Sequence, residues 1–185
     1  MKKFFTILLA TMVAVGSVYA ADKGNQAAKS GKPYNYSIGI VAGSGIGVQF
    51  KDMITDHFTL IEEFGYLGSL CAAGANGANV PTLGAIDNLV LAYQAKAAEG
   101  QGIQLDWFVG GQIKGGYLGN TGFGSAGLIG IGVAAGIDAK MKNAPIAFSF
   151  DFRPGYGCVL SNWGGGVGAA HVFDWTLNLG VRYAF

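Results

Sequence analysis

The sequence predicts an all-β protein, an eight-stranded antiparallel up-and-down transmembrane β-barrel, from three observations. Large apolar residues alternate with small or polar ones in segment after segment, and a period of two residues indicates β-strands. Charged residues make up only 12% of the chain, about half the usual share, although 51% of the residues are hydrophobic. After the first twenty residues no apolar run is long enough for a membrane-spanning helix, so a closed barrel is the remaining way to span a membrane.

The N-terminal segment predicts export. A pair of lysines precedes a short apolar stretch, and small residues follow where a signal peptidase cleaves. We therefore expect residues 1–20 to be a cleaved signal peptide, residues 21–33 to be a polar leader, and residues 34–185 to form the barrel domain. An N-terminal membrane anchor is the alternative, but the apolar stretch is short for a membrane span.

Turn residues divide the alternating part of the chain into strands. The segment 34–53 is long enough for one strand or two, and Gly43-Ser44-Gly45 suits a tight reversal because glycine adopts turn conformations at no steric cost. A reversal there gives eight strands, an even number as in bacterial single-chain barrels. The expected strands are 35–42, 46–53, 57–70, 88–98, 102–116, 126–141, 146–156 and 172–185.

The connections between these strands alternate in length. Long connections are expected at 71–87, 118–125 and 157–171, and the others are short. Outer-membrane barrels have short periplasmic turns and longer outer loops, so both ends of the barrel domain are expected on the periplasmic side. In the third strand the alternation is disturbed at Glu62-Glu63, where a β-bulge would restore it. Which of the two glutamates faces inward stays open.

The composition of the two strand faces indicates their orientation. One face is small and polar, which suits an eight-stranded lumen that is just wide enough for side chains. Aromatic residues gather near strand ends, as in the girdles at the two membrane interfaces. A soluble barrel with an apolar interior is the alternative, but its outer face would carry more charged residues.

With this orientation, the lumen receives nearly equal numbers of positive and negative side chains. A charge held away from water is costly unless it is paired, so we expect a paired network that seals the lumen. A proton or ion path is the alternative, because charges at membrane depth often mark one. The expected network consists of Lys51, Lys96, Asp106, Lys114, Asp138, Lys140, Asp151, Arg153, Asp174 and Arg182, with one of Glu62 or Glu63.

The last segment, "FDWTLNLGVRYAF" (173–185), has a large apolar residue at every odd position. It resembles the closing strand of Gram-negative outer-membrane β-barrels, and "SIGIVAGSGIGVQFKDMI" (37–54) and "FSFDFRPGYG" (148–157) resemble small porin-like members of that class (OmpA/OmpX-like) of mostly unassigned role. The resemblance implies an outer-membrane location and recognition of the last strand by the barrel-assembly machinery. The residues implied in that signal are Leu177, Leu179, Val181, Tyr183 and Phe185.

The cysteines and histidines provide little evidence of chemistry. In an oxidising compartment Cys71 and Cys158 could form a disulfide, but they follow strands on opposite walls, roughly 15 Å apart, so the loops would have to fold over the mouth. A metal site of both cysteines and His171 lacks the usual ligand spacing. His57 and His171 are expected at opposite ends of the barrel. We therefore predict no catalytic, metal-binding or cofactor-binding residues and no cofactor.

These observations predict an outer-membrane barrel with a sealed lumen that acts as a structural or interaction protein. Its expected partners are outer-membrane lipid, the barrel-assembly machinery and an unidentified extracellular partner, contacted by the loops 71–87 and 158–170. The balanced charge gives no footprint for nucleic acid, and we expect a monomer. Two alternatives remain open: a narrow channel or transporter for a small or apolar solute, and a lipid-modifying enzyme that uses His171.

Overall fold

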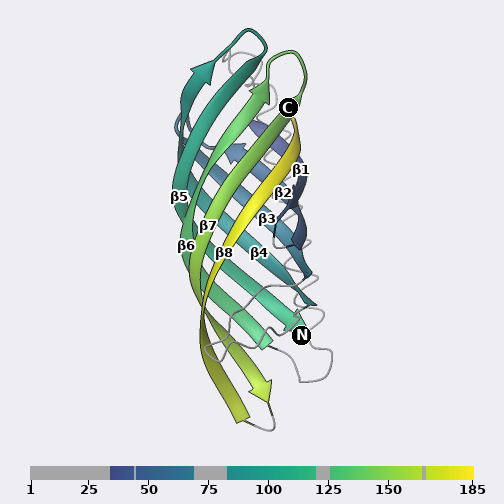
Figure 1. Cartoon of the computed structure of the whole chain (residues 1–185), viewed down its shortest axis with the longest axis vertical. Helices are drawn as coiled ribbons and strands as arrows, with labels where there is room; N and C mark the ends of the chain where they lie inside the picture. Colours follow the sequence, from purple (N-terminus) through teal and green to yellow (C-terminus); the bar gives the residue numbers. More distant parts are fainter. Residues whose placement is uncertain (1–33, 44, 69–82, 120–125, 164–165) are drawn as a thin grey trace.

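The chain forms one closed antiparallel β-barrel (Figure 1). The computed structural model describes residues 34–43, 45–68, 83–119, 126–163 and 166–185, so the predicted signal peptide and leader lie outside the described residues. Each strand pairs with the next, and β8 pairs with β1, which confirms the predicted all-β, eight-stranded, up-and-down fold. The strands are β1 Tyr36–Ala42, β2 Gly45–Met53, β3 Phe58–Gly68, β4 Leu83–Glu99, β5 Ile103–Gly119, β6 Ala126–Met141, β7 Ile146–Trp163 and β8 Gly166–Ala184.

The predicted reversal near Gly43 divides residues 34–53 into two strands. β1 and β2 pair antiparallel from Tyr36 opposite Asp52 to Ala42 opposite Ile46. The Gly43 N–H donates to the carbonyl oxygen of Gly45 at 2.9 Å, which closes the hairpin. The count of eight strands is therefore confirmed.

The register of the strands determines their tilt. Directly paired residues form a line that starts at Ile38 on β1, passes through each strand in turn and reaches Phe173 on β8. Across the closing pair of strands, however, Ile38 pairs with Tyr183. The register is therefore displaced by ten residues around the ring. Such a displacement in an eight-stranded ring requires strands tilted by about 40°, and Figure 1 shows them running obliquely. The lumen of a barrel this size has room for side chains and little else.

The two ends of the barrel differ in their connections. At one end, which we call the turn end, residues 54–57, 100–102 and 142–145 connect β2 to β3, β4 to β5 and β6 to β7, and the barrel also begins and finishes there. The opposite end, which we call the hairpin end, carries the other four connections. This alternation of ends follows from the up-and-down order of the strands.

The predicted loop at 157–171 is wrong, because most of it belongs to strands. β7 and β8 pair without interruption from Ile146 opposite Tyr183 to Trp163 opposite Gly166, so they form a long hairpin that extends past the other strands (Figure 1). Glycine and alanine are frequent in this segment and carry no apolar alternation. Pairing with the neighbouring strand, rather than local pattern, makes it β-structure.

The predicted bulge in the third strand is also wrong. β3 pairs continuously with β2 and β4 through Glu62 and Glu63, with Glu63 buried inside the barrel and Glu62 on the outer face. The shift in register lies instead in β4, between Lys96 and Ala98. β4 also begins at Leu83, so the last part of the expected loop 71–87 is strand, whereas residues 69–82 lie outside the described residues.

The barrel carries its large apolar side chains outside and its charged side chains inside. Ile46, Ile129 and Leu179 on the outer face are each more than 60% exposed, whereas Arg153 and Arg182 in the lumen are each 2% exposed. A soluble barrel has the opposite arrangement. The described residues include no helix that could cross a membrane.

Closure of the barrel depends on a glycine in β1. A Cβ on Gly39 would lie 2.0 Å from the Val181 carbonyl oxygen and 2.5 Å from the Arg182 Cα, too close unless the β1–β8 pair moves apart. We predict that Gly39→Ala sharply lowers the yield of folded barrel. The measurement is the fraction of refolded protein whose band on a denaturing gel moves when the sample is heated.

Gly111→Ala is the matched control for this prediction. Gly111 lies in β5 on the outer face, and a Cβ there would meet nothing within 4 Å. We expect a wild-type yield from this variant. Equal losses from both substitutions would mean that glycine flexibility, rather than the close approach of β1 to β8, controls folding.

Candidate functional site

The half of the lumen nearer the turn end holds a cluster of charges around Asp138 on β6. Lys51 from β2 donates to one carboxylate oxygen of Asp138 at 2.7 Å, and Arg182 from β8 donates to the other. Arg182 also donates to the side-chain oxygen of Gln49. The side chains of Lys51, Asp138 and Arg182 are at most 3% exposed. Three walls of the barrel thus meet at one buried carboxylate.

A second cluster, centred on Arg153, lies closer to the hairpin end. Arg153 makes two hydrogen bonds to Asp151, at 2.7 and 3.0 Å, and its third nitrogen lies 2.8 Å from a carboxylate oxygen of Glu63. Asn178 donates to Asp151 at 2.9 Å. Gln49 donates to Glu63 at 3.4 Å and so connects this cluster to the one around Asp138.

One further ion pair lies toward each end of the lumen. Lys140 lies 2.8 Å from Asp106 near the turn end, where Gln94 and Gln104 also donate to Asp106 at 2.8 Å. At the hairpin end, Lys114 donates to one carboxylate oxygen of Asp174. The described lumen therefore holds paired charges along its whole length.

Apolar side chains also occupy part of the lumen beside these clusters. β3 to β6 contribute a buried apolar layer made of Ile61, Val90, Ala92, Phe108 and Ala134. Phe108 breaks the alternation of β5 and points inward, where the Lys51 ammonium lies 4.8 Å from the centre of its ring. This contact is a cation–π interaction, which helps hold a desolvated ammonium. The layer and the clusters thus bring apolar and charged side chains together inside the barrel.

A cavity of about 320 Å³ lies at the turn end, lined by groups that include His57, Glu99 and Lys140. Tyr34, just before β1, crosses toward the β6–β7 turn, and its hydroxyl contacts the carbonyl oxygens of Ala144, at 2.5 Å, and Met141. Partial burial raises the pKa of the Tyr34 hydroxyl, so it stays protonated as a donor. Tyr34 therefore partly covers this mouth.

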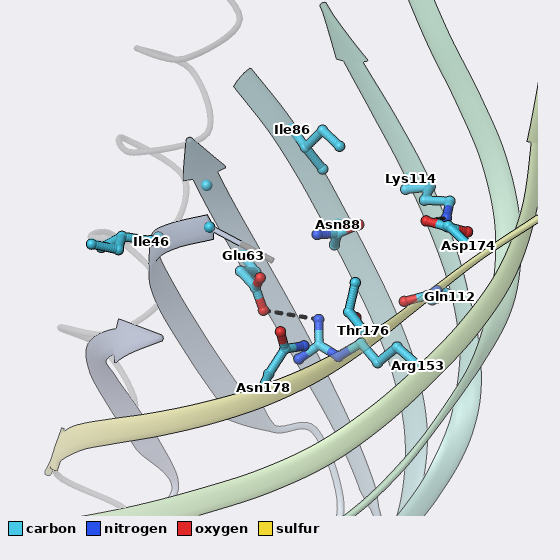
Figure 2. A pocket seen from close by; sticks show the side chains of 13 residues that line it. Ile46, Glu63, Ile86, Asn88, Gln112, Lys114, Arg153, Asp174, Thr176 and Asn178 are labelled. Atoms are coloured by element: carbon cyan, nitrogen blue, oxygen red, sulfur yellow. Dashed lines mark hydrogen bonds and ion pairs between the residues drawn. The ribbon is translucent and has the colours of Figure 1, made fainter. Parts of the chain in front are cut away.

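A smaller cavity, of about 40 Å³, lies at the hairpin end, and Figure 2 shows the side chains that line it. Glu63 and Arg153 form its floor, joined by the dashed line, and Lys114 and Asp174 lie together at one side. We call it the hairpin-end cavity. Its charged groups are two cations and two anions.

The structure places all but one of the predicted network residues inside the lumen. Lys96 is the exception and corrects the prediction: its side chain is 55% exposed at the turn end and pairs with Glu99 at 2.6 Å. The register shift beside it and its place near the end of β4 bring it to the mouth, where water reaches it. The predicted network left out four uncharged polar residues that also point into the lumen. Each lies an even number of residues from a predicted charge on its own strand, so the alternation could have identified them: Gln49, Gln94, Gln112 and Asn178.

The other predicted residues lie on the outer face or outside the described residues. Those of the terminal strand signal are exposed along the outer face of β8: Leu177, Leu179, Val181, Tyr183 and Phe185. Cys71 is outside the described residues, so the possible disulfide is not tested, and Cys158 on β7 has no disulfide partner among the described residues. His57 lies in a turn and stacks on Tyr93, with ring centres 5.4 Å apart.

His171 and Asp174 do not form a catalytic pair. The His171 ring stacks on Tyr156 on the outer face, with ring centres 5.7 Å apart, whereas Asp174 points into the lumen and binds Lys114. Odd-numbered and even-numbered residues of one strand point to opposite faces of the sheet, so these two side chains cannot meet. Among the described residues no three His, Cys, Asp or Glu side chains are grouped as metal ligands.

Two solved structures are similar in fold to this chain. One is a major outer membrane protein from Thermus thermophilus, with a TM-score of 0.46 and 14% identity over 81% of this chain and 99% of that chain. The other is Ail, the attachment invasion locus protein of Yersinia pestis, with a TM-score of 0.30 and 13% identity over 80% of this chain and 93% of that one. No protein-family model and no curated protein matches the sequence.

Loss of the Asp138 carboxylate, which binds two buried cations, should be strongly destabilising. Asp138→Asn leaves Lys51 and Arg182 buried without their anion, and breaking a buried ion pair from one side costs about 3–5 kcal/mol. We predict a loss of that size in the free energy of unfolding, measured by urea titration of the barrel in lipid vesicles. Glu99→Gln, at the exposed turn end, is the control and should leave the unfolding midpoint nearly unchanged. Similar midpoints for the two variants would contradict the prediction.

Proposed function

We propose that this protein is an integral barrel of the Gram-negative outer membrane whose sealed lumen makes it a structural or interaction protein. The observation that carries the proposal is the inverted arrangement of the wall, with exposed apolar side chains outside and buried ion pairs inside. An apolar outer face is suited to contact with lipid. The closed ring also pairs the backbone N–H and C=O groups of every strand with its neighbours, as lipid requires.

The outer face has the dimensions of a membrane span. Near the turn end, Phe58, Tyr93 and Trp107 on three neighbouring strands contact one another, with ring centres 5.8 and 5.7 Å apart. Tyr117 and Tyr156 lie exposed toward the hairpin end. Ten residues of β5 separate Trp107 from Tyr117, and on a strand tilted by about 40° they rise by roughly 25 Å, the height of the apolar band of outer-membrane barrels.

The chemistry of the lumen supports a sealed barrel rather than a channel. The path between the two main clusters passes through the Arg182 guanidinium and the Gln49 amide, neither of which gives up a proton at physiological pH. The apolar layer with Phe108 occupies the other side at the same depth. Hydrogen-bonded polar side chains and the apolar layer therefore occupy the lumen at this level, which favours the structural role over the solute channel.

The hairpin end supports the interaction role. The β7–β8 hairpin extends beyond the other strands, and with the turn end in the periplasm it would stand outside the cell (Figure 1). His171 lies on this hairpin without an acidic partner on its own face among the described residues, so the lipid-modifying enzyme has less support. The hairpin is the surface that an extracellular partner would meet first.

The test is conductance across a planar bilayer. We predict that the wild-type barrel, shown to be folded by its heat-dependent gel mobility, gives no discrete current steps. Current steps from the wild type would favour the channel and contradict a sealed lumen.

A variant that opens the lumen provides the positive control. Changing Lys51, Asp138 and Arg182 all to serine removes the cluster around Asp138 without leaving an unpaired charge. We expect this triple variant to conduct if it folds and inserts. A silent triple variant would show that the apolar layer alone closes the barrel.

A further inference from the structure

The wall of the barrel is lower between β8 and β2 than elsewhere. β1 ends at Ala42, opposite Leu179, whereas β8 extends to Gly166. Above Ala42 the described residues therefore place no strand beside β8 on that side. We call this opening, bounded by β8 and by the β1–β2 hairpin, the notch.

Backbone groups of β8 point into the notch. Tyr36 and Phe185 exchange both of their backbone hydrogen bonds, at 3.2 and 2.8 Å, so odd-numbered residues of β8 turn their N–H and C=O groups toward β1. Trp175 is also odd-numbered and lies nearer the hairpin end than Leu179, the last residue of β8 that pairs with β1, so its backbone groups have no β1 residue opposite them. The notch thus presents backbone N–H and C=O groups of β8 beside the apolar side chains of its outer face.

The hairpin-end cavity opens into the notch. Gly45 and Gly47 line it from β2, and Asp174 and Thr176 line it from β8, the two strands that bound the notch. Ile46, which is 68% exposed on the outer face, lines it as well. The described residues therefore leave a ligand a route into the cavity from the side of the barrel as well as along its axis.

Two residues that line the cavity each carry a buried hydrogen-bond acceptor with no protein partner. Gln112 is 5% exposed, and its side-chain oxygen, which points into the cavity in Figure 2, accepts no hydrogen bond. One carboxylate oxygen of Asp174 is likewise buried and unpartnered, because Lys114 binds the other. Buried acceptors without donors are costly, so they favour a ligand that donates hydrogen bonds.

The size and charge of the cavity restrict that ligand. About 40 Å³ holds two or three non-hydrogen atoms, which is the end of a molecule rather than a whole one. The two cations, Lys114 and Arg153, already bind carboxylates, so the acceptors that stay open belong to Asp174 and Gln112. A primary ammonium has three donors and a positive charge, and it matches both acceptors.

We propose that the hairpin-end cavity binds the primary ammonium group of a small amine or of an amine-bearing lipid that enters through the notch. Asp174 and Gln112 accept its hydrogen bonds, and an attached chain leaves past Ile46 onto the apolar outer face. The lateral route for a lipid rests on the proposed membrane location, whereas the ammonium site does not.

Calorimetric titration of the full-length barrel, folded in a maltoside detergent without amines, tests the site with three probes. These are lysophosphatidylethanolamine, lysophosphatidylcholine and free ethanolamine. The first two differ only in methylation of the nitrogen, which removes every N–H donor. We expect lysophosphatidylethanolamine to bind at least tenfold more tightly than lysophosphatidylcholine. Equal affinity of the two lipids, or no binding of either amine, would overturn the proposal.

A matched pair of glutamine variants locates the site. Gln112→Met removes an acceptor from the cavity and should weaken ammonium binding about tenfold, the effect of one hydrogen bond to a charged group. Gln94→Met removes an equally buried glutamine oxygen at the turn end and should leave binding unchanged. Equal weakening by both variants would overturn the assignment to the cavity.

The free amine distinguishes the two sources of the ammonium group. Binding of ethanolamine as tight as that of lysophosphatidylethanolamine would support the site and assign it to a soluble amine. Much weaker binding of ethanolamine would support the site and show that the lipid chain contributes through the notch. Because these titrations are made on the folded barrel in detergent, a conducting wild-type barrel would reject the sealed lumen without affecting their result.

Discussion

The structure depends on closure of an eight-stranded sheet around a lumen that is only as wide as its own side chains. Closure with strands tilted by about 40° crowds the inward side chains, so a long side chain needs a small residue paired beside it on the neighbouring strand. Glycines fulfil this role: a Cβ on Gly136 would lie 2.7 Å from the Phe108 ring, and one on Gly132 would lie 2.6 Å from the Gln112 amide nitrogen. The abundant glycine is thus partly a consequence of the narrow lumen.

The same narrowness explains why the lumen is electrically balanced. Five cations and five anions point inward among the described residues, and each lies within ion-pair distance of an opposite charge. With no room for bulk water, an unpaired charge would have neither solvent nor counterion. Two of the pairs, Lys51 with Asp138 and Arg153 with Glu63, join strands that lie opposite each other in the ring, so they brace the barrel across its axis.

The wall is uneven in height, and this asymmetry gives the barrel its distinctive surfaces. β1 and β2 have seven and nine residues, whereas β7 and β8 have eighteen and nineteen. The long hairpin projects beyond the ring (Figure 1), and the short one leaves the notch beside the hairpin-end cavity. The uneven wall thus places the hairpin-end cavity beside its lowest part.

The sequence by itself determined the strands and their faces, because a period of two assigns alternate residues to opposite sides of a sheet. It could not place Glu62 and Glu63, since both are polar and only continuous pairing of β3 with its neighbours orients them. Residues 157–171 lacked a pattern because glycine and alanine suit either face. Which charges pair, and where the cavity and the notch lie, were decided by the tertiary structure alone, because the register of closure selects which residues meet across the lumen.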